Sequence, residues 1–132
     1  MEHSRITKLI VTVVAFAFLG DPALAQDQAG CNGTNYEMRV CFSTTYEKSD
    51  AELNAVYRAV LKELAGYLKP VRHIENLRMS ERRWMAYRDA QCKAQYDLFE
   101  GGSGGPIENL GCLIELTDRR TAELRQTYLS PR

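Results

Sequence analysis

The amino-acid sequence predicts an all-α fold, an antiparallel three-helix bundle that is crosslinked by two disulfides. Apolar residues recur at three- and four-residue steps in three long segments, which is the spacing of one face of a helix. Strand signals are almost absent, because no segment sustains an apolar–polar alternation and no Asn-Gly turn joins two apolar runs. Four cysteines follow a hydrophobic N-terminal segment, an even number that suits two crosslinks in a short exported chain.

The first 25 residues are typical of a secretory signal peptide. A basic start precedes an apolar run over residues 9–20, and residues 23–25 read Ala-Leu-Ala, a small-x-small cleavage site. The apolar run is too short for a helix to cross a hydrocarbon layer of roughly 30 Å. We therefore predict that residues 1–25 are removed. Residues 26–132 then form a single domain without a membrane span, which is periplasmic or secreted.

The first predicted helix covers residues 35–65. Thr34 and Glu37 form a capping box, in which each side chain satisfies a backbone N–H of the other residue. Apolar residues then continue to Gly66, at a C-cap position where a residue that tolerates positive φ is favoured. A second capping-box pattern begins at Ser49, so the helix could kink or restart there.

Two further helices follow. Pro70 suits the first turn of the second helix, because its missing N–H costs nothing there, and this helix should end near Phe99. Residues 101–105 read Gly-Gly-Ser-Gly-Gly, which predicts a flexible link, and Pro106 opens the third helix. The expected inward-facing residues are Ile74, Leu77, Glu81, Trp84, Arg88 and Cys92 in the second helix and Leu110, Leu113, Leu116, Ala122, Leu124 and Tyr128 in the third.

The positions of the cysteines favour one pairing. Cys92 lies near the end of the second helix and Cys112 near the start of the third, so at about 1.5 Å per residue both come to the same height in an antiparallel pair. Cys31, just before the cap, then pairs with Cys41. A bond between Cys41 and Cys92, offset by roughly 7.5 Å along the axes, stays open as an alternative. We expect no metal site, because there is no Cys-x-x-Cys pair and His73 is the one histidine left after cleavage.

Charge and motif content argue against several function classes. Basic and acidic residues number 17 each, whereas a polyanion binder is normally basic, so nucleic acid is not an expected partner. The sequence has no phosphate-binding loop and no attractive Ser-His-Asp arrangement. Asp50, Glu52, Glu81 and Asp89 could supply an acid and a base for glycoside cleavage, but such residues on a helix are usually solvated or paired. We therefore expect no enzyme activity and no cofactor.

The densest cluster of chemically distinctive residues lies in the second helix. Trp84, Tyr87, Arg88 and Cys92 follow at steps of three and four, which places them on one side of that helix. We interpret Trp84 as a core residue, with Arg88 lying over it or paired with Asp50. The other interpretation is a binding surface, because Trp, Tyr and Arg dominate interface hot spots.

Two ordered sets of motifs span residues 31–124. The first set is Cys31…Met38-x-x-Cys41 and Asp50-x-x-Leu53-Asn54-x-x-Tyr57. The second set is Trp84-x-x-Tyr87-Arg88-Asp89-Ala90-x-Cys92, Gly101-Gly102-Ser103 and Cys112…Leu116-Thr117-x-x-Arg120-Thr121-x-x-Leu124. Their combination resembles the LprI-type lysozyme inhibitor family. The chain departs from it at Glu81, where such sequences often carry Gln, and in lacking the lipid-attachment cysteine of the lipoprotein that names the family.

The resemblance implies a periplasmic binding protein that protects peptidoglycan by blocking the cleft of lysozyme or another peptidoglycan hydrolase. Because a lysozyme cleft is built around two carboxylates, we expect a basic or hydroxyl-bearing group to enter it. The candidate binding residues are Gly102 and Ser103, in an accessible link flanked by basic helix faces, together with Arg88. The alternatives are a plain interhelical loop at 101–105, an envelope interaction or immunity-like module with another protein partner, and a carboxylate-dependent hydrolase.

We expect the residues at the centre of these motifs to hold the three helices together. They lie on or beside the apolar stripes, where removing one member of a buried charge pair costs roughly 3–5 kcal/mol. Asp50 should therefore pair with Arg88 or with Arg120. The full set of expected structural residues is Asp50, Asn54, Tyr57, Trp84, Tyr87, Arg88, Thr117 and Arg120.

Overall fold

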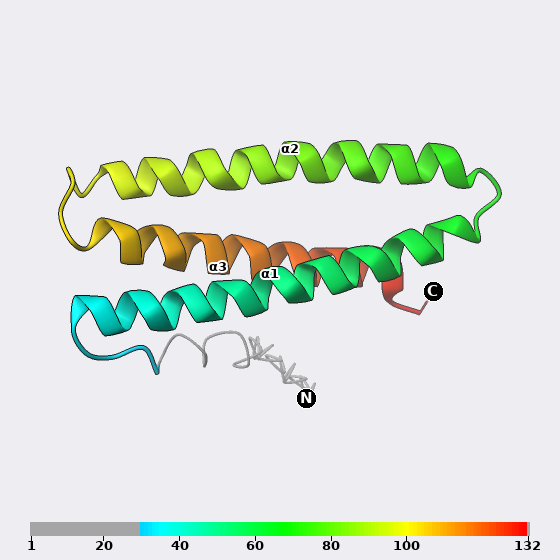
Figure 1. The fold of residues 1–132 in the computed structure, drawn as a ribbon. Coiled ribbons are helices and arrows are strands. Elements are labelled where there is room, and N and C mark those ends of the chain that lie inside the picture. The colour runs from blue at the N-terminus through cyan, green and yellow to red at the C-terminus, as the bar shows by residue number, and fades with distance from the viewer. Residues whose placement is uncertain (1–29, 132) are drawn as a thin grey trace, which may run out of the picture.

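The computed structural model describes residues 30–131, so the predicted signal peptide lies outside the described residues. This part of the chain folds into three helices, α1 (Asn35–Ala65), α2 (Pro70–Asp97) and α3 (Gly105–Leu124), and a π-helical turn, η2 (Arg125–Leu129), continues α3. Consecutive helices run antiparallel, so that α1 and α3 point the same way, and no strand occurs in the described range (Figure 1). The predicted all-α three-helix bundle is confirmed. No helix within residues 30–131 is both long and apolar enough to span a membrane.

The start of α1 has the predicted capping box. The backbone N–H of Thr34 donates to Oε2 of Glu37 at 2.8 Å, and the N–H of Glu37 donates to the Thr34 hydroxyl at 3.3 Å. The first of these bonds lowers the pKa of the Glu37 carboxyl, because it stabilises the charged form. The helix then passes Ser49 without interruption, so the second capping-box pattern does not start a new helix.

The end of α1 differs from the prediction. Gly66 has a φ of −79°, not the positive φ expected of a C-cap glycine. Its N–H donates to the carbonyl of Glu63 at 3.1 Å, so a tight i→i+3 turn satisfies the last carbonyls without a left-handed residue. Positive φ is found instead before α1, at Gly33 (132°), and at the start of the link between α2 and α3, at Glu100 (48°) and Gly101 (82°).

The link between α2 and α3 begins earlier than expected and covers residues 98–104. Helix α2 ends at Asp97, two residues before Phe99, and α3 already begins at Gly105. The N–H of Gly102 donates to the Phe99 carbonyl at 2.7 Å, and that of Gly105 donates to the Gly102 carbonyl at 3.1 Å. The link is therefore a run of hydrogen-bonded turns.

The disulfides are Cys31–Cys41 and Cys92–Cys112, each with its Cα atoms 5.5 Å apart. The preferred pairing is thus confirmed and the Cys41–Cys92 alternative is wrong. One disulfide ties the segment before α1 to the second turn of that helix, and the other joins α2 to α3 near the glycine-rich link.

Helix α3 occupies the central position of the bundle. It packs extensively against both α1 and α2, whereas α1 and α2 contact each other least (Figure 1). The main hydrophobic cluster lies in the half of the bundle where α1 and α2 join. Its buried members are Leu53, Val56, Val60, Leu64, Leu77 and Leu124.

The buried face of α3 agrees with the predicted apolar stripe only in part, since Leu124 is completely buried but other predicted positions are not. Leu113 and Leu116 are only half-buried and Ala122 is exposed, while Ile114 and Thr117 are almost completely buried. The reason is that α3 is covered from two sides, so its inward face is wider than one stripe. Threonines are tolerated there because a hydroxyl can bond its own helix, as Thr121 does to the Thr117 carbonyl at 2.9 Å.

Candidate functional site

A hollow of about 230 Å³ lies between α1 and α2, and we call it the α1–α2 groove. It exists because these two helices, although consecutive, are held apart by their separate contacts with α3. Its lining residues follow each other at helical spacing on the two facing sides. They are Asp50, Leu53, Asn54 and Tyr57 from α1 and Arg78, Glu81, Arg82, Met85 and Arg88 from α2.

Arg88 lies at the inner end of the groove and connects all three helices. Its side chain is 9% exposed, and its Nη1 atom lies 3.9 Å from Oδ1 of Asp50 on α1 and 3.4 Å from the Thr117 hydroxyl on α3. Its Nη2 and Nε atoms both lie 2.9 Å from Oδ1 of the neighbouring Asp89. Arg88, rather than Arg120, is therefore the arginine that faces Asp50.

Two aromatic rings complete the surroundings of Arg88. The guanidinium carbon lies 5.2 Å from the ring centre of Trp84 and 5.8 Å from that of Tyr46, within the range of cation–π attraction. Burial raises the pKa of the Tyr46 phenol, against the opposing effect of the Arg88 charge. Trp84 is half-buried and packs against the main hydrophobic cluster. The Arg88 charge is thus enclosed by carboxylates and ring faces.

The second buried charge pair joins α2 to α3. Arg120 donates from Nε and from Nη2 to Oε1 of Glu81, the Nε bond being 2.9 Å long, and both residues are at least nine-tenths buried. Nη2 also donates to the Ser80 hydroxyl at 3.2 Å, and Nη1 lies 2.8 Å from Glu123. Burial lowers the pKa of Arg120, but the bonds and charges of Glu81 and Glu123 outweigh it and raise that pKa overall.

Asn54 and Tyr57 line the groove from α1. The Asn54 amide donates to the Asp50 carbonyl at 2.8 Å and to its carboxylate at 2.9 Å, so Asn54 fixes the orientation of Asp50. Tyr57 is half-buried against the main hydrophobic cluster. Tyr87, which we expected beside Trp84 as a structural residue, is 55% exposed and lines no part of the groove.

The side-chain carboxylates of Asp50, Glu52, Glu81 and Asp89 are all placed beside arginines, an arrangement that does not favour acid–base catalysis. Glu81 is held by Arg120, Asp50 and Asp89 both face Arg88, and Glu52 pairs with Arg125. A general acid and a general base would need to face a common open space with a substrate bond between them. Across residues 30–131, no three His, Cys, Asp or Glu side chains come together in a way that could bind a metal ion.

The glycine-rich link lies at the opposite end of the bundle from the α1–α2 turn (Figure 1). Gly102 and Ser103 are exposed, and the Ser103 hydroxyl accepts a hydrogen bond from the Asn35 amide at 2.8 Å. Along the chain, the charged residues nearest the link are acidic apart from one lysine, which is paired with Asp97. These residues are Lys93, Asp97, Glu100 and Glu108.

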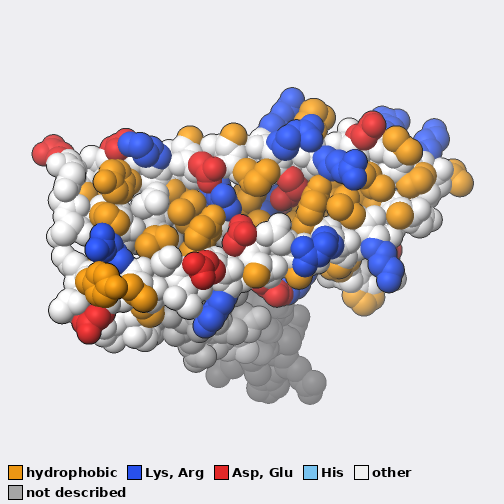
Figure 2. Space-filling view, in the orientation of Figure 1, with side chains coloured by type: hydrophobic (Ala, Val, Ile, Leu, Met, Phe, Trp, Pro, Cys, Tyr) orange, Lys and Arg blue, Asp and Glu red, His pale blue; other side chains and the backbone are white. Residues whose placement is uncertain are grey.

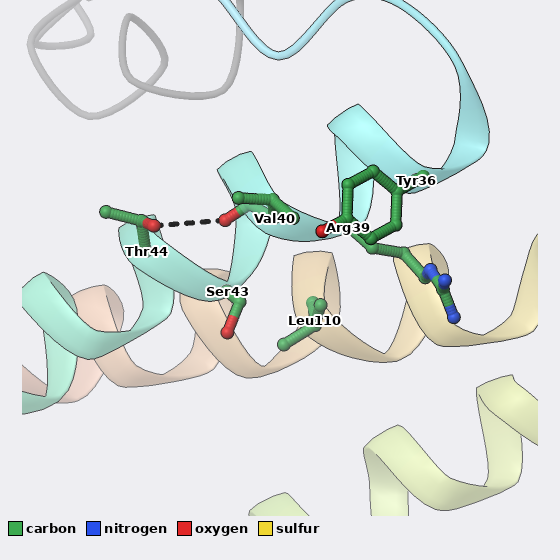
Figure 3. A pocket seen from close by; sticks show the side chains of 6 residues that line it. All are labelled: Tyr36, Arg39, Val40, Ser43, Thr44 and Leu110. Atoms are coloured by element: carbon green, nitrogen blue, oxygen red, sulfur yellow. Dashed lines mark hydrogen bonds between the residues drawn. The ribbon is translucent and has the colours of Figure 1, made fainter.

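A shallow hollow of about 380 Å³ lies on the same half of the bundle as the link. Figure 3 shows its lining side chains, which come from the first turns of α1 and from Leu110 of α3. Tyr36 and Val40 are 68% and 50% exposed, and Arg39 is the one charged lining residue. The sequence gives no sign of this hollow, because its residues belong to no motif and meet only when α1 packs on α3.

Comparison with known proteins gives two matches. The family model described as "Lysozyme inhibitor LprI" matches residues 25–124. An uncharacterized protein of Rhizobium meliloti (strain 1021) is 37% identical over 98 residues, which cover 68% of this chain and 70% of the relative. No solved structure matches the chain.

Proposed function

The chain belongs to the LprI lysozyme inhibitor family, and on that premise we propose that it binds and blocks a lysozyme-type peptidoglycan hydrolase outside the cytoplasm. The observation that carries the proposal is the family match over residues 25–124, which includes both disulfides and both buried arginines. The protein acts by binding rather than by catalysis.

Two features of the fold support this function. The disulfides suit a chain that works in an oxidising compartment such as the periplasm, where lysozyme meets the cell wall. The carboxylates of the groove are occupied by arginines, so the polar residues of the motifs hold a rigid scaffold. A rigid scaffold favours inhibition, because little conformational entropy is lost when it binds.

The glycine-rich link is one candidate contact with the enzyme. Gly102 and Ser103 lie exposed at a turn, and the neighbouring Leu98 and Phe99 are 80% and 41% exposed. An exposed turn with apolar neighbours is a common form of protein-binding loop. The second candidate is the α1–α2 groove, where Arg88 lies at the inner end.

The direct test is a lysis assay. The purified mature protein, with both disulfides formed, is added in increasing amounts to lysozyme and a suspension of bacterial cell walls, and binding is measured separately by titration calorimetry. We expect lysis to slow in proportion to the fraction of enzyme bound. Unchanged lysis with a large excess of the protein, together with no measurable complex, would show that this member does not inhibit lysozyme.

A pair of variants tests the link. Ser103→Ala removes the hydroxyl together with its hydrogen bond to Asn35, whereas Asn35→Ala removes the same bond and leaves the hydroxyl in place. If the hydroxyl enters the enzyme cleft, Ser103→Ala weakens inhibition and Asn35→Ala does not. Equal inhibition by both variants and the parent would exclude the Ser103 hydroxyl from the contact.

A further inference from the structure

Charge is unevenly distributed in this formally neutral chain. Residues 54–85, which form the second half of α1, the turn and the first half of α2, contain seven Lys and Arg residues against three Asp and Glu residues. This stretch therefore has an excess of four positive charges. One of its three acidic residues, Glu81, is buried against Arg120 and contributes little to the outer surface.

The basic side chains lie on both sides of the α1–α2 groove. Arg78 and Arg82 line the groove from α2, and Arg58 lines an adjoining hollow that shares Asp50 and Asn54 with it. Figure 2 shows Lys and Arg side chains over the half of the molecule where α1 and α2 join, with hydrophobic side chains between them. The charges are thus gathered around one apolar depression.

These arginines have no partners within the described part of the protein. Arg58, Arg78 and Arg82 are exposed and take part in none of the ion pairs or side-chain hydrogen bonds found among residues 30–131. By contrast, Arg119 and Arg125 are paired with Glu115 and Glu52. Guanidinium groups without an internal partner are available to a carboxylate of another molecule.

The apolar part of the depression suits a protein partner. Leu53 is buried at its base, Tyr57 is half-buried, and Met85 is 43% exposed beside Arg82. Tyr, Met and Arg are the residue types enriched in protein interfaces, because each combines a large apolar body with adaptable or charged contacts. A small anion would need only the charges, and it would gain nothing from Tyr57 and Met85.

We propose that the basic rim of the α1–α2 groove, with Arg78 and Arg82 at its centre, docks onto the carboxylate-lined substrate cleft of the hydrolase. This inference rests on the proposed function and names the surface that performs it. The complementarity is chemical, since the cleft of a glycoside hydrolase carries catalytic carboxyl groups and an ionised carboxylate can accept two charge-assisted hydrogen bonds from one guanidinium group. Arg78 and Arg82 are one helical turn apart on α2, so both side chains project from the same ridge of that helix.

The test compares two charge-reversed proteins. The double variant Arg78→Glu/Arg82→Glu alters the rim, and Arg39→Glu/Lys48→Glu is the matched control, because it changes the net charge equally at exposed sites away from the rim. Melting curves followed by circular dichroism establish that both fold. We expect the rim variant to lose about tenfold or more in lysozyme affinity per arginine, the control to lose less than about threefold, and Arg78→Lys/Arg82→Lys to recover part of the loss.

The outcomes separate this inference from the proposed function. If the parent inhibits lysozyme and the rim variant inhibits equally well, the docking surface is wrong and the function stands. If the parent neither binds nor inhibits lysozyme, both are overturned. A third measurement tests binding of the parent and the rim variant to vesicles of anionic lipid. If the parent binds the vesicles, the rim variant does not, and both proteins bind lysozyme equally, the rim contacts a membrane surface and the inference is overturned.

Discussion

Replacing Glu81 with alanine is the sharpest test of how this bundle is held together. Glu81 and Arg120 have side chains that are only 10% and 9% exposed, and they join α2 to α3. Without Glu81, the guanidinium of Arg120 keeps the Ser80 hydroxyl and Glu123, whose side chain is 61% exposed. A buried positive charge is then left with a single charged partner, which water screens.

The expected loss follows from that geometry. Breaking a buried charge pair by removing one member costs roughly 3–5 kcal/mol, and the remaining Glu123 contact places Glu81→Ala near the lower end, at about 3 kcal/mol. For a domain of this size, that loss lowers the melting temperature by about 12 °C. The measurement is urea unfolding of the oxidised protein followed by circular dichroism at neutral pH, with melting curves alongside.

Two further variants separate charge from packing. Glu81→Gln keeps a side-chain oxygen that can accept from Arg120, so it should lose only about 1 kcal/mol. The double variant Glu81→Leu/Arg120→Met removes both charges and should lie within about 1 kcal/mol of the parent, since well-packed apolar residues can replace a buried pair. If Glu81→Ala loses less than about 1 kcal/mol, or if the double variant is as unstable as Glu81→Ala, the reasoning about an uncompensated charge is refuted.

Three other predictions concern the remaining contacts. The capping-box bond lowers the pKa of the Glu37 carboxyl, so the stability that this bond contributes is present above the ordinary pKa of 4.5 and is lost as the pH falls through the lowered pKa. The urea midpoint of the parent should therefore fall more steeply between about pH 5 and about pH 3 than that of Glu37→Gln, and an equal fall in both proteins would contradict this. Arg88→Ala and Trp84→Ala should both lower the melting temperature, because they open the enclosed charge cluster; unchanged melting with lost lysozyme binding would make the cluster a recognition site. Replacing both Cys92 and Cys112 by alanine should lower the free energy of unfolding by about 3 kcal/mol, since their disulfide closes a loop of 20 residues. The loss is measured by urea unfolding of the variant and the parent without reductant, so that the parent keeps its disulfide.

The sequence alone determined the features that depend on neighbours along the chain. The capping box of Thr34 and Glu37, the proline start of α2 and the helical spacing of apolar residues involve positions within about four residues of each other, so local rules placed α1 correctly. The disulfide pairing was only favoured by the sequence: antiparallel helices bring Cys92 and Cys112 to the same height, but a Cys41–Cys92 bond stayed open until the structure excluded it. The motifs sufficed for the family resemblance, which the family match over residues 25–124 confirms.

Only the tertiary structure decided which charged side chains meet. Asp50 could have faced either arginine, since both guanidiniums lie on long side chains. The packing of both α1 and α2 on α3 places Arg88 of α2 beside Asp50 and leaves Arg120 of α3 to Glu81. The same holds for the exposure of Tyr87 and for the two-sided burial of α3, which depend on the rotation of each helix about its axis. The rotation and spacing of helices are set by contacts between side chains that are far apart in the sequence. The basic rim around the α1–α2 groove therefore depends on the packing of α1 and α2 against α3, which local sequence patterns do not specify.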